Sequence, residues 1–176
     1  MRQINIEYFK TPMGELIIGS YKNSLCIADW RYRKMRNTID NRIKAGLDAE
    51  YIEDSSPIIE ETKAQLSQYF AGERTEFDIP ILLIGSDFQK SVWNTLLQIP
   101  YGKTDTYLGL SKKLENEKAI RAVASANGAN CISIIIPCHR IIGSNGKLVG
   151  YAGGLSVKKK LLVLEKALIG NQLSIF

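Results

Sequence analysis

Four consecutive residues in the second half of this chain, Pro137-Cys138-His139-Arg140, combine a nucleophile, a base and a cation. His139 is the only histidine among the 176 residues, and apolar residues flank the segment on both sides. A cysteine reacts as the thiolate, which a neighbouring imidazole or guanidinium stabilises. The segment therefore predicts a nucleophilic cysteine at a break between two buried strands. A core cysteine that acts only as a small hydrophobic residue is the alternative.

Glu165 is the second indication of chemistry. In a helix predicted from about Val157 to Ile169, its four neighbours on the same face are all apolar: Leu161, Leu162, Leu168 and Ile169. A carboxylate in such surroundings needs a partner, and no Lys or Arg lies one turn away, so we expect His139 to pair with it. Cys138, His139 and Glu165 would then be nucleophile, base and orienting acid. Because neighbouring strand residues point to opposite faces, proton transfer between Cys138 and His139 would need a turn or a bridging water.

Composition and charge restrict the classes of protein to consider. Hydrophobic residues make up 45% and charged residues 23%, as in ordinary soluble proteins. The N-terminus does not resemble a signal peptide, and no apolar run approaches the roughly 18 residues of a membrane helix. Three cysteines without a secretory signal favour reduced thiols. We therefore expect a cytoplasmic protein, nuclear in a eukaryote, with no membrane partner.

Charge is unevenly distributed along the chain. Residues 1–84 hold 11 Lys+Arg and 13 Asp+Glu, a net of −2, whereas residues 85–176 hold 12 and 5, a net of +7. A basic half favours a polyanionic partner such as nucleic acid. A lysine-rich solvated surface is the alternative.

The pattern of elements also divides the chain, into residues 1–85 and 86–176. In the first part, apolar runs at 4–9, 16–21 and 25–30 predict three strands. A charged stretch, residues 31–54, is assigned no element. A helix then begins after Ser55-Ser56, with Pro57 in its first turn, and ends before Gly72.

Besides the helix around Glu165, three helices and a hairpin are predicted in the second part. One ends before Ile99, Thr106 caps a short second helix over about 107–114, and the third covers about 117–128. The short turn between the last two is typical of a helix-turn-helix. Asn145-Gly146 between apolar runs predicts a β-hairpin, so the whole is interpreted as a winged helix.

The third of these helices has an unusually bare surface. Ile120 and Val123 form its expected inward stripe, and Arg121 is the only long side chain among small ones: Ala122, Ala124, Ser125, Ala126 and Gly128. Such a face lets a phosphate backbone approach closely, and Arg121 could enter a groove or a base stack. A buried helix with Arg121 in an ion pair is the alternative.

Taken together, the motifs resemble those of DNA O6-alkylguanine alkyltransferases, also called methylated-DNA–protein-cysteine methyltransferases. The similarity is carried by these residues: Phe88-Gln89, Val92-Trp93, Ile99-Pro100-Tyr101-Gly102, Arg121-Ala122-Val123, Asn130, Pro137-Cys138-His139-Arg140, Gly143-Ser144, Gly150-Tyr151-Ala152-Gly153-Gly154-Leu155, Lys158, Leu161-Leu162 and Glu165. The first half is similar more loosely, through Thr11-Pro12-Met13-Gly14 and the strands around it.

This resemblance implies an α+β fold. Residues 1–85 would form a small β-sheet and helix domain that is ribonuclease H-like, and residues 86–176 a winged helix-turn-helix domain that binds DNA and accepts the alkyl group. The implied activity is a single, stoichiometric transfer from O6-alkylguanine in double-stranded DNA, after the base is flipped from the minor groove. Whether O4-alkylthymine is also a substrate stays open. No cofactor and no metal are implied, and the protein is expected to be a monomer.

The resemblance also implies roles for individual residues. Cys138 would take the alkyl group, His139 would deprotonate it through a water, and Glu165 would hold His139. Asn130 would brace the segment before the nucleophile, and Tyr107 would crowd the phosphate and donate a proton to the leaving base.

Further residues are implied to contact the nucleic acid. Arg121 would fill the gap left by the flipped base, with further DNA contacts from Ala122, Ser125, Ala126, Gly128 and Tyr107. The base pocket would be lined by Ile141, Tyr151, Ala152 and Gly153.

The chain departs from the family pattern at Cys131, which stands where proline is usual after Asn130, and at Ala124 and Ser125, where glycine is commoner. Three other classes of protein compete. One is a structural zinc site made of Cys26, Cys131, Cys138 and His139, whose spacing is unsuitable. A DNA-lesion-binding module without transfer would lack the nucleophile that is present here. A cysteine hydrolase would need an oxyanion-hole motif, and none is evident.

Overall fold

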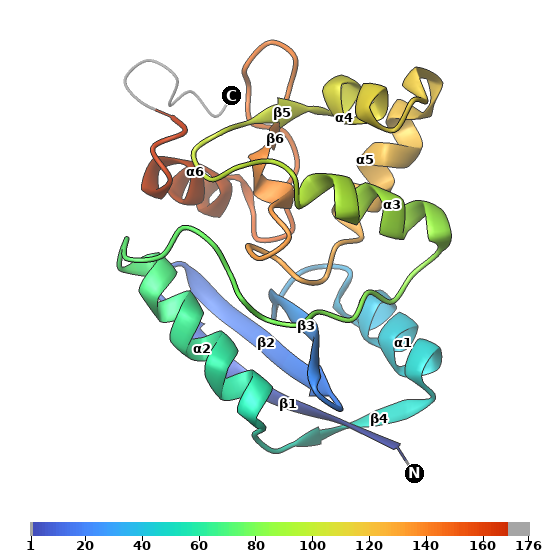
Figure 1. Ribbon diagram of the computed structural model, residues 1–176, viewed down its shortest axis with the longest axis vertical. Coiled ribbons are helices and arrows are strands. Elements are labelled where there is room, and N and C mark those ends of the chain that lie inside the picture. The colour runs from blue at the N-terminus through green and yellow to red at the C-terminus, as the bar shows by residue number, and fades with distance from the viewer. Residues whose placement is uncertain (1, 169–176) are drawn as a thin grey trace. The chain divides into compact units, whose positions relative to one another are not determined.

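The computed structural model describes residues 2–168 and divides the chain between Gly85 and Ser86 into two compact units (Figure 1). The first unit contains a mixed four-stranded sheet in the order β3-β2-β1-β4. Its strands are β1 (Arg2–Thr11), β2 (Gly14–Tyr21), β3 (Ser24–Trp30) and β4 (Ala49–Glu53). β2 runs antiparallel to β1 and β3, whereas β4 runs parallel to β1. The three predicted strands are therefore confirmed.

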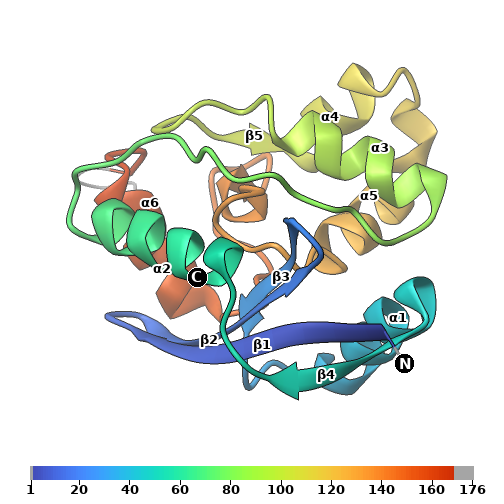
Figure 2. The ribbon, with the colours of Figure 1, turned by 60° about the horizontal axis from the view of Figure 1, so that its bottom comes forward.

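Helix α2 (Pro57–Phe70) packs against β1, β2 and β3, and both ribbon views show it beside the sheet (Figure 1, Figure 2). Its start is as predicted, because the Ser56 side chain accepts a hydrogen bond from the Ile59 amide at 3.1 Å and Pro57 is the first helical residue. Apolar burial holds this unit together. The fully buried side chains include Ile4, Leu16, Ile18, Leu25, Ile27, Ile59 and Leu66.

The charged stretch 31–54, to which no element was assigned, contains helix α1 (Arg36–Leu47) and strand β4. The helix has no side-chain N-cap, and the side chains it buries are Ile39 and Ile43. Ion pairs fix its start: the buried Asp29 at the end of β3 lies 3.2 Å from Arg33 Nη1 and 3.1 Å from Arg36 Nη1. Two apolar residues one turn apart are only a weak signal for a helix in so charged a stretch.

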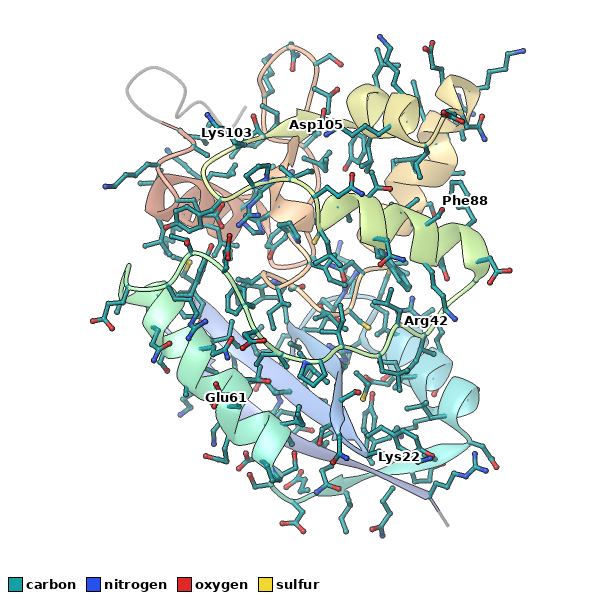
Figure 3. All side chains as sticks on the ribbon, viewed as in Figure 1. Lys22, Arg42, Glu61, Phe88, Lys103 and Asp105 are labelled. Atoms are coloured by element: carbon teal, nitrogen blue, oxygen red, sulfur yellow. The ribbon has the colours of Figure 1, made fainter. Side chains whose placement is uncertain are left out.

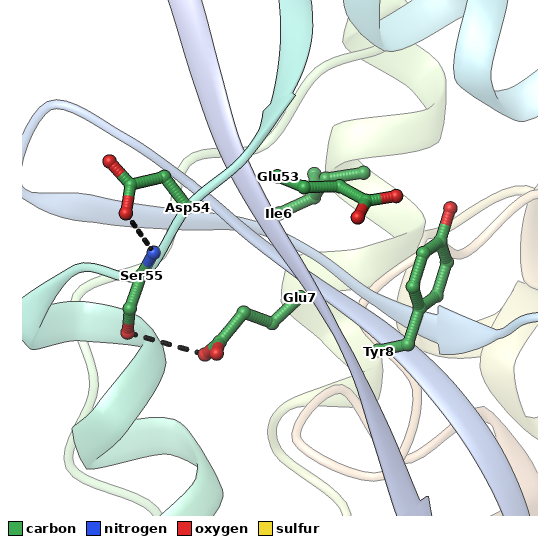
Figure 4. A pocket seen from close by; sticks show the side chains of 6 residues that line it. All are labelled: Ile6, Glu7, Tyr8, Glu53, Asp54 and Ser55. Carbon is green, nitrogen blue, oxygen red and sulfur yellow. Dashed lines mark hydrogen bonds between the residues drawn. The ribbon is translucent and has the colours of Figure 1, made fainter.

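A shallow pocket opens where β1, β4 and the residues before α2 meet (Figure 4). It is lined by Ile6, Glu7, Tyr8, Glu53, Asp54 and Ser55. The Ser55 hydroxyl donates to Glu7 Oε2 at 3.2 Å, and Lys63 Nζ donates to the same oxygen at 3.2 Å. These bonds tie the first strand to the start of α2.

The second unit is mainly helical, and α3, α4 and α5 pack against one another. Its elements are α3 (Asp87–Leu96), β5 (Asp105–Thr106), α4 (Tyr107–Lys113), the 3₁₀ turn Glu117–Ala119, α5 (Ile120–Gly128), the 3₁₀ turn Cys138–Arg140, β6 (Ile141–Ile142) and α6 (Leu155–Leu164). Val92, Leu96, Leu110 and Val123 are fully buried at the centre of this unit. The predicted helix-turn-helix is present as α4 and α5, and Thr106 caps α4 by accepting from the Gly109 amide at 2.9 Å.

The predicted hairpin is only partly correct. Residues 143–147 form a turn, in which the Gly143 amide donates to the Lys147 carbonyl at 2.8 Å. Residues 148–150 form no strand, and β6 pairs instead in parallel with β5. The wing is therefore a loop. Its Leu148 packs with Leu162 and Leu168, which fixes the loop by apolar contact instead of by a strand ladder.

Two helical predictions need correction. Ile120 was expected to face inward but is 38% exposed, because it lies at the first position of α5 directly after the 3₁₀ turn. The last helix begins at Leu155 and ends at Leu164, so Glu165 is its C-cap residue and Lys166 follows with a left-handed φ of 58°. Ile169, which was expected to extend that helix, lies outside the described residues.

Neither a membrane-spanning helix nor a metal-binding cluster is found within residues 2–168. None of their helices combines the length and hydropathy needed to cross a bilayer. No three of their His, Cys, Asp or Glu side chains are arranged to hold a metal ion, so the four residues of the alternative zinc site do not gather.

A capping box begins the second unit, and its contribution can be measured. Ser86 Oγ accepts from the Gln89 amide at 3.1 Å, and Gln89 Oε1 accepts from the Ser86 amide at 2.9 Å. Replacing Ser86 by Ala should lower the free energy of unfolding by about 1 kcal/mol in a denaturant titration. Ser67→Ala, at an exposed position inside α2, is the control and should not destabilise. Equal stability of the Ser86 variant and the wild type would contradict the capping role.

Candidate active site

Cys138 lies on a 3₁₀ turn, not between two strands. Pro137 adopts φ −81° and ψ 61°, so the chain reverses and the Cys138 amide donates to the Ile136 carbonyl at 2.8 Å. The turn Cys138–Arg140 follows, and β6 begins at Ile141. The predicted strand before the cysteine is therefore wrong. The turn removes the strand alternation that would have placed Cys138 and His139 on opposite faces.

Asn130 closes the loop that precedes the cysteine. Its Nδ2 donates to the Ile136 carbonyl at 3.0 Å, and its Oδ1 accepts from the Ile132 amide at 3.0 Å. Within this loop the buried Ile134 has a φ of 72°, which is unfavourable for a β-branched residue. Cys131, at the position where proline is usual, is 5% exposed. The Asn130 amide thus holds a strained loop against the turn that carries Cys138.

His139, Arg140 and Glu165 form a buried cluster. His139 Nε2 lies 2.7 Å from Glu165 Oε2, which is the pairing that the sequence predicted. Arg140 adds a two-pronged contact, with Nε 2.8 Å from Oε1 and Nη2 3.2 Å from Oε2, while its Nη1 donates to the Ile99 carbonyl at 2.6 Å. From the sequence, Arg140 is expected to stabilise the Cys138 thiolate, and its ion pair with Glu165 is not predicted. The apolar neighbourhood of Glu165 was the available signal, because a buried carboxylate calls for a full cation.

The electrostatics of this cluster fix its protonation. Burial alone would raise the pKa of Glu165, but His139 and Arg140 outweigh burial and lower that pKa to about 2. Burial lowers the pKa of His139, although its bond to Glu165 opposes the shift. The imidazole is therefore neutral at neutral pH, with Nε2–H donating to the carboxylate. Nδ1 then carries the lone pair, and it has no hydrogen-bond partner within residues 2–168.

Tyr107 is brought to the cysteine by the parallel pairing of β5 and β6. Asp105 is opposite Ile141 and Thr106 opposite Ile142, so the first residue of α4 follows directly. Figure 3 labels Asp105 at this junction, where its Oδ1 accepts from the Thr106 amide at 2.8 Å. Burial raises the pKa of Tyr107, and the nearby Cys138 adds to the shift. The Tyr107 hydroxyl lies 3.8 Å from the point where a Cβ on Gly150 would be.

Lys158 was noted in the sequence only as part of a motif, and the structure buries it completely. Its Nζ donates to the carbonyls of Val149 and Gly150 at 2.9 and 3.1 Å. Burial lowers the pKa of Lys158 to about 8, against the attraction of Cys138. This lysine therefore anchors the loop after the wing to α6 and places a positive charge near the nucleophile.

The residues expected to line the base pocket occupy the segments on either side of the wing. Ile141 is fully buried, and Tyr151, Ala152 and Gly153 are half-buried. The Tyr151 ring lies edge-on to the His139 ring, with 6.4 Å between centroids. The structure therefore brings Tyr151 to the cluster, and the two small residues follow it in the chain.

Helix α5 presents part of the expected DNA-binding face. Arg121, Ala122, Ser125 and Gly128 are exposed, so the alternative of a fully buried helix is wrong. Ala126 is an exception: it is 2% exposed, and its carbonyl accepts from Trp93 Nε1 at 2.8 Å. Because its side chain faces the core, Ala126 is removed from the expected contact face.

Comparisons with known proteins assign both units of the chain to domains of the same family. A family model described as the DNA-binding domain of 6-O-methylguanine DNA methyltransferase matches residues 87–167, and one described as its ribonuclease-like domain matches residues 4–83. A methylated-DNA–protein-cysteine methyltransferase of Methanosarcina acetivorans is 43% identical over 89% of this chain and 95% of its own. One of Mycobacterium leprae is 39% identical over 98% and 99%.

A solved structure shares the fold as well. The crystal structure of Mycobacterium tuberculosis OGT in complex with DNA matches with a TM-score of 0.78 and 35% identity, covering 98% of each chain. Sequence similarity, family models and fold thus agree over nearly the whole length. The chain belongs to the methylated-DNA–protein-cysteine methyltransferase family.

Proposed function

We propose that this protein repairs O6-alkylguanine in double-stranded DNA by transferring the alkyl group to Cys138 and keeping it there. The observation that carries the proposal is the cluster beside the cysteine: a neutral His139 whose Nε2 is held by Glu165 and whose Nδ1 is left to accept a proton. In this arrangement Nδ1 takes the thiol proton through a bridging water. Arg140 keeps Glu165 ionised, and the ionised carboxylate fixes the orientation of the His139 ring through its hydrogen bond to Nε2.

The transfer itself is a displacement at carbon. Cys138 Sγ attacks the alkyl carbon, an S–C bond forms and the bond from that carbon to guanine O6 breaks. The electron pair stays with the base, which takes a proton from the Tyr107 hydroxyl and leaves as guanine. Because a thioether has no easy route back to a thiol, the protein acts once.

Access to O6 requires that the base leave the stack, since an in-line nucleophile cannot reach it inside a duplex. In the proposal the exposed face of α5 approaches the DNA backbone from the minor groove, and Arg121 fills the vacated position. Ala152 and Gly153 leave room for the base. The protein would act as a monomer in the compartment that holds the DNA.

Stoichiometry tests the proposal directly. Incubation with a duplex oligonucleotide carrying O6-methylguanine should add one methyl group per chain, and peptide mapping should place it on Cys138. Cys138→Ser should bind the DNA but gain no mass. Cys26→Ser, at a buried cysteine in the first unit, is the matched control and should still gain one methyl group. Several turnovers per chain, or binding without an adduct, would refute the proposal.

Glu165→Gln tests the orienting acid. The amide keeps the shape but removes the charge that fixes His139, so single-turnover transfer should slow by roughly tenfold or more while DNA affinity is kept. Leaving Arg140 without its carboxylate should also cost about 3 kcal/mol of stability, so rates are measured well below the melting temperature. Glu117→Gln, at an exposed glutamate, is the control. An unchanged transfer rate would remove Glu165 from the mechanism.

Arg121→Ala separates flipping from chemistry. Flipping the base out of duplex DNA costs roughly a few kcal/mol of unstacking, which Arg121 would offset by filling the vacated position. Free O6-methylguanine needs no such extrusion. The variant should therefore slow repair of duplex DNA far more than repair of the free base. Lys118 is an exposed cation in the 3₁₀ turn, two residues before α5 begins, and Lys118→Ala should change mainly the salt dependence of binding. Equal losses on both substrates would mean that Arg121 supports the fold or the pocket instead.

A further inference from the structure

The turn after α3, residues 99–102, contacts the buried cluster but takes no part in the proposed transfer. The Tyr101 hydroxyl donates to the Leu164 carbonyl at 3.3 Å. The Arg140 guanidinium lies over the Tyr101 ring, with Cζ 5.8 Å from the ring centroid. Arg140 Nη1 in turn donates to the Ile99 carbonyl at 2.6 Å. The turn therefore contacts both the arginine of the buried ion pair and the last residue of α6, which directly precedes the glutamate of that pair.

Gly102 brings the same turn against the backbone of Glu165. Its φ of 77° lies in the left-handed region, and a Cβ at this position would lie 3.1 Å from the Glu165 carbonyl oxygen. At that distance a side chain would require the carbonyl to move, and the left-handed backbone would be strained as well. Glycine therefore permits an approach that seats the turn directly on the residue whose carboxylate holds His139.

The position of Glu165 depends on such outside contacts because α6 ends at this residue. Glu165 is the C-cap of the helix, and Lys166 leaves the helical path with a φ of 58°. The last carbonyls of a helix have no donor within the helix, and helix ends fray. Tyr101 supplies a donor to the last helical carbonyl, that of Leu164. This bond fixes the backbone from which the carboxylate projects.

The neighbouring charges keep the Tyr101 hydroxyl a donor. Burial raises the pKa of this phenol, and the Glu165 carboxylate adds to that shift, although Arg140 opposes it. The hydroxyl is therefore protonated at neutral pH. The electron-rich face of the ring attracts the Arg140 guanidinium, and this cation–π contact favours one orientation of the arginine. One side chain thus acts on both sides of the ion pair.

We propose that Tyr101 is a positioning residue that keeps Glu165 in the place from which it orients His139. Its hydroxyl fixes the backbone at the end of α6, and its ring fixes the arginine that keeps the carboxylate ionised. The inference rests on the proposed function, in which His139 takes the Cys138 proton through a water, and it adds a residue to the support of that base. In this scheme Tyr101 touches neither the alkylated nucleotide nor the thiol.

A double-mutant cycle with Glu165 tests this role. Tyr101→Leu removes the hydrogen bond and the ring, and should slow single-turnover transfer roughly three- to tenfold, the loss expected for one hydrogen bond and one cation–π contact. Tyr101→Phe keeps the ring, so it should recover part of that loss. In a Glu165→Gln background, Tyr101→Leu should cause little further loss, because the charge that it positions is absent. Tyr32→Leu, at a tyrosine that is 77% exposed in the first unit, is the control for the substitution.

The pH dependence of thiol reactivity separates positioning from a general loss of structure. Without DNA, alkylation of Cys138 by iodoacetamide requires deprotonation of the thiol, and mass spectrometry of its peptide follows the reaction. A loosely held His139 takes the thiol proton less readily. The pH midpoint of this reaction should therefore rise in Tyr101→Leu, and rise less in Tyr101→Phe. A change that only lowered stability would leave the midpoint unchanged while the protein stays folded, which circular dichroism checks at each pH.

Gly102→Ala gives a second test with a closely matched control. The added methyl group should displace the Glu165 carbonyl, slow the transfer and raise the same pH midpoint. Gly72 also has a φ of 77°, but a Cβ there would meet nothing within 4 Å. Gly72→Ala thus imposes the same backbone strain without the contact, and should lower stability while leaving the transfer rate and the midpoint as in wild type. This pair of variants decides the question if Tyr101→Leu melts near the assay temperature.

Each of three results would overturn the inference. One is additivity of the losses from Tyr101→Leu and Glu165→Gln, and another is slower transfer with an unchanged pH midpoint, since either would mean that Tyr101 only supports the fold. The third is a wild-type rate in both Tyr101→Leu and Gly102→Ala. A wild-type protein that formed no adduct with the alkylated duplex would refute the proposed function alone, because the iodoacetamide midpoint is measured without DNA and still reports on Tyr101.

Discussion

The second unit depends on a single buried carboxylate. Glu165 is 1% exposed, and a charge at that depth is tolerated only if its oxygens are fully engaged. Arg140 and His139 come from one 3₁₀ turn, so satisfying the carboxylate also fixes the orientation of the turn that carries Cys138. Arg140 reaches in addition to the Ile99 carbonyl at the end of the α3 segment. The ion pair therefore joins three stretches of chain around the nucleophile. The two partners of Glu165 are not equivalent, because Arg140 supplies the charge and the neutral His139 supplies a base.

Around this cluster, hydrogen bonds from side chains to backbone fix the loops that apolar packing alone would not hold in one conformation. Asn130 holds a loop in which Ile134 has a left-handed φ, and Lys158 donates to the carbonyls of Val149 and Gly150. Each is a buried polar side chain bonded to backbone, which fixes the loops without giving them regular secondary structure. This accounts for a site built almost entirely on turns within a helical unit.

Sequence-based prediction succeeded for elements that depend on interactions between residues close in the sequence, and mostly failed where the interactions are long-range. Caps and apolar periods predicted α2 and α4, because Ser56 and Thr106 act within three residues of themselves. Helix α1 was not predicted, because its buried face consists of only Ile39 and Ile43 within a charged stretch, and ion pairs to Asp29 fix its start. The pairing of His139 with Glu165 was predictable, since the chain has one histidine. The contribution of Arg140 was not, because residues 85–176 hold 12 Lys and Arg and the sequence does not say which of these cations reaches the buried acid. Ala126 was misplaced because a small residue fits a bare surface and a tight core equally well.

The same cluster makes folding a proton-linked equilibrium. In the folded protein the pKa of Glu165 is about 2 and that of His139 lies below its ordinary value, so both groups bind protons less readily than in the unfolded chain. Acid therefore favours unfolding, first as the pH falls below about 6.5, where an unfolded histidine is protonated, and again as it falls from about 4.5 toward 2. In this pH range Glu165 and His139 bind protons in the unfolded chain but not in the folded protein. A turn that keeps one imidazole neutral thus makes this half of the molecule sensitive to acid.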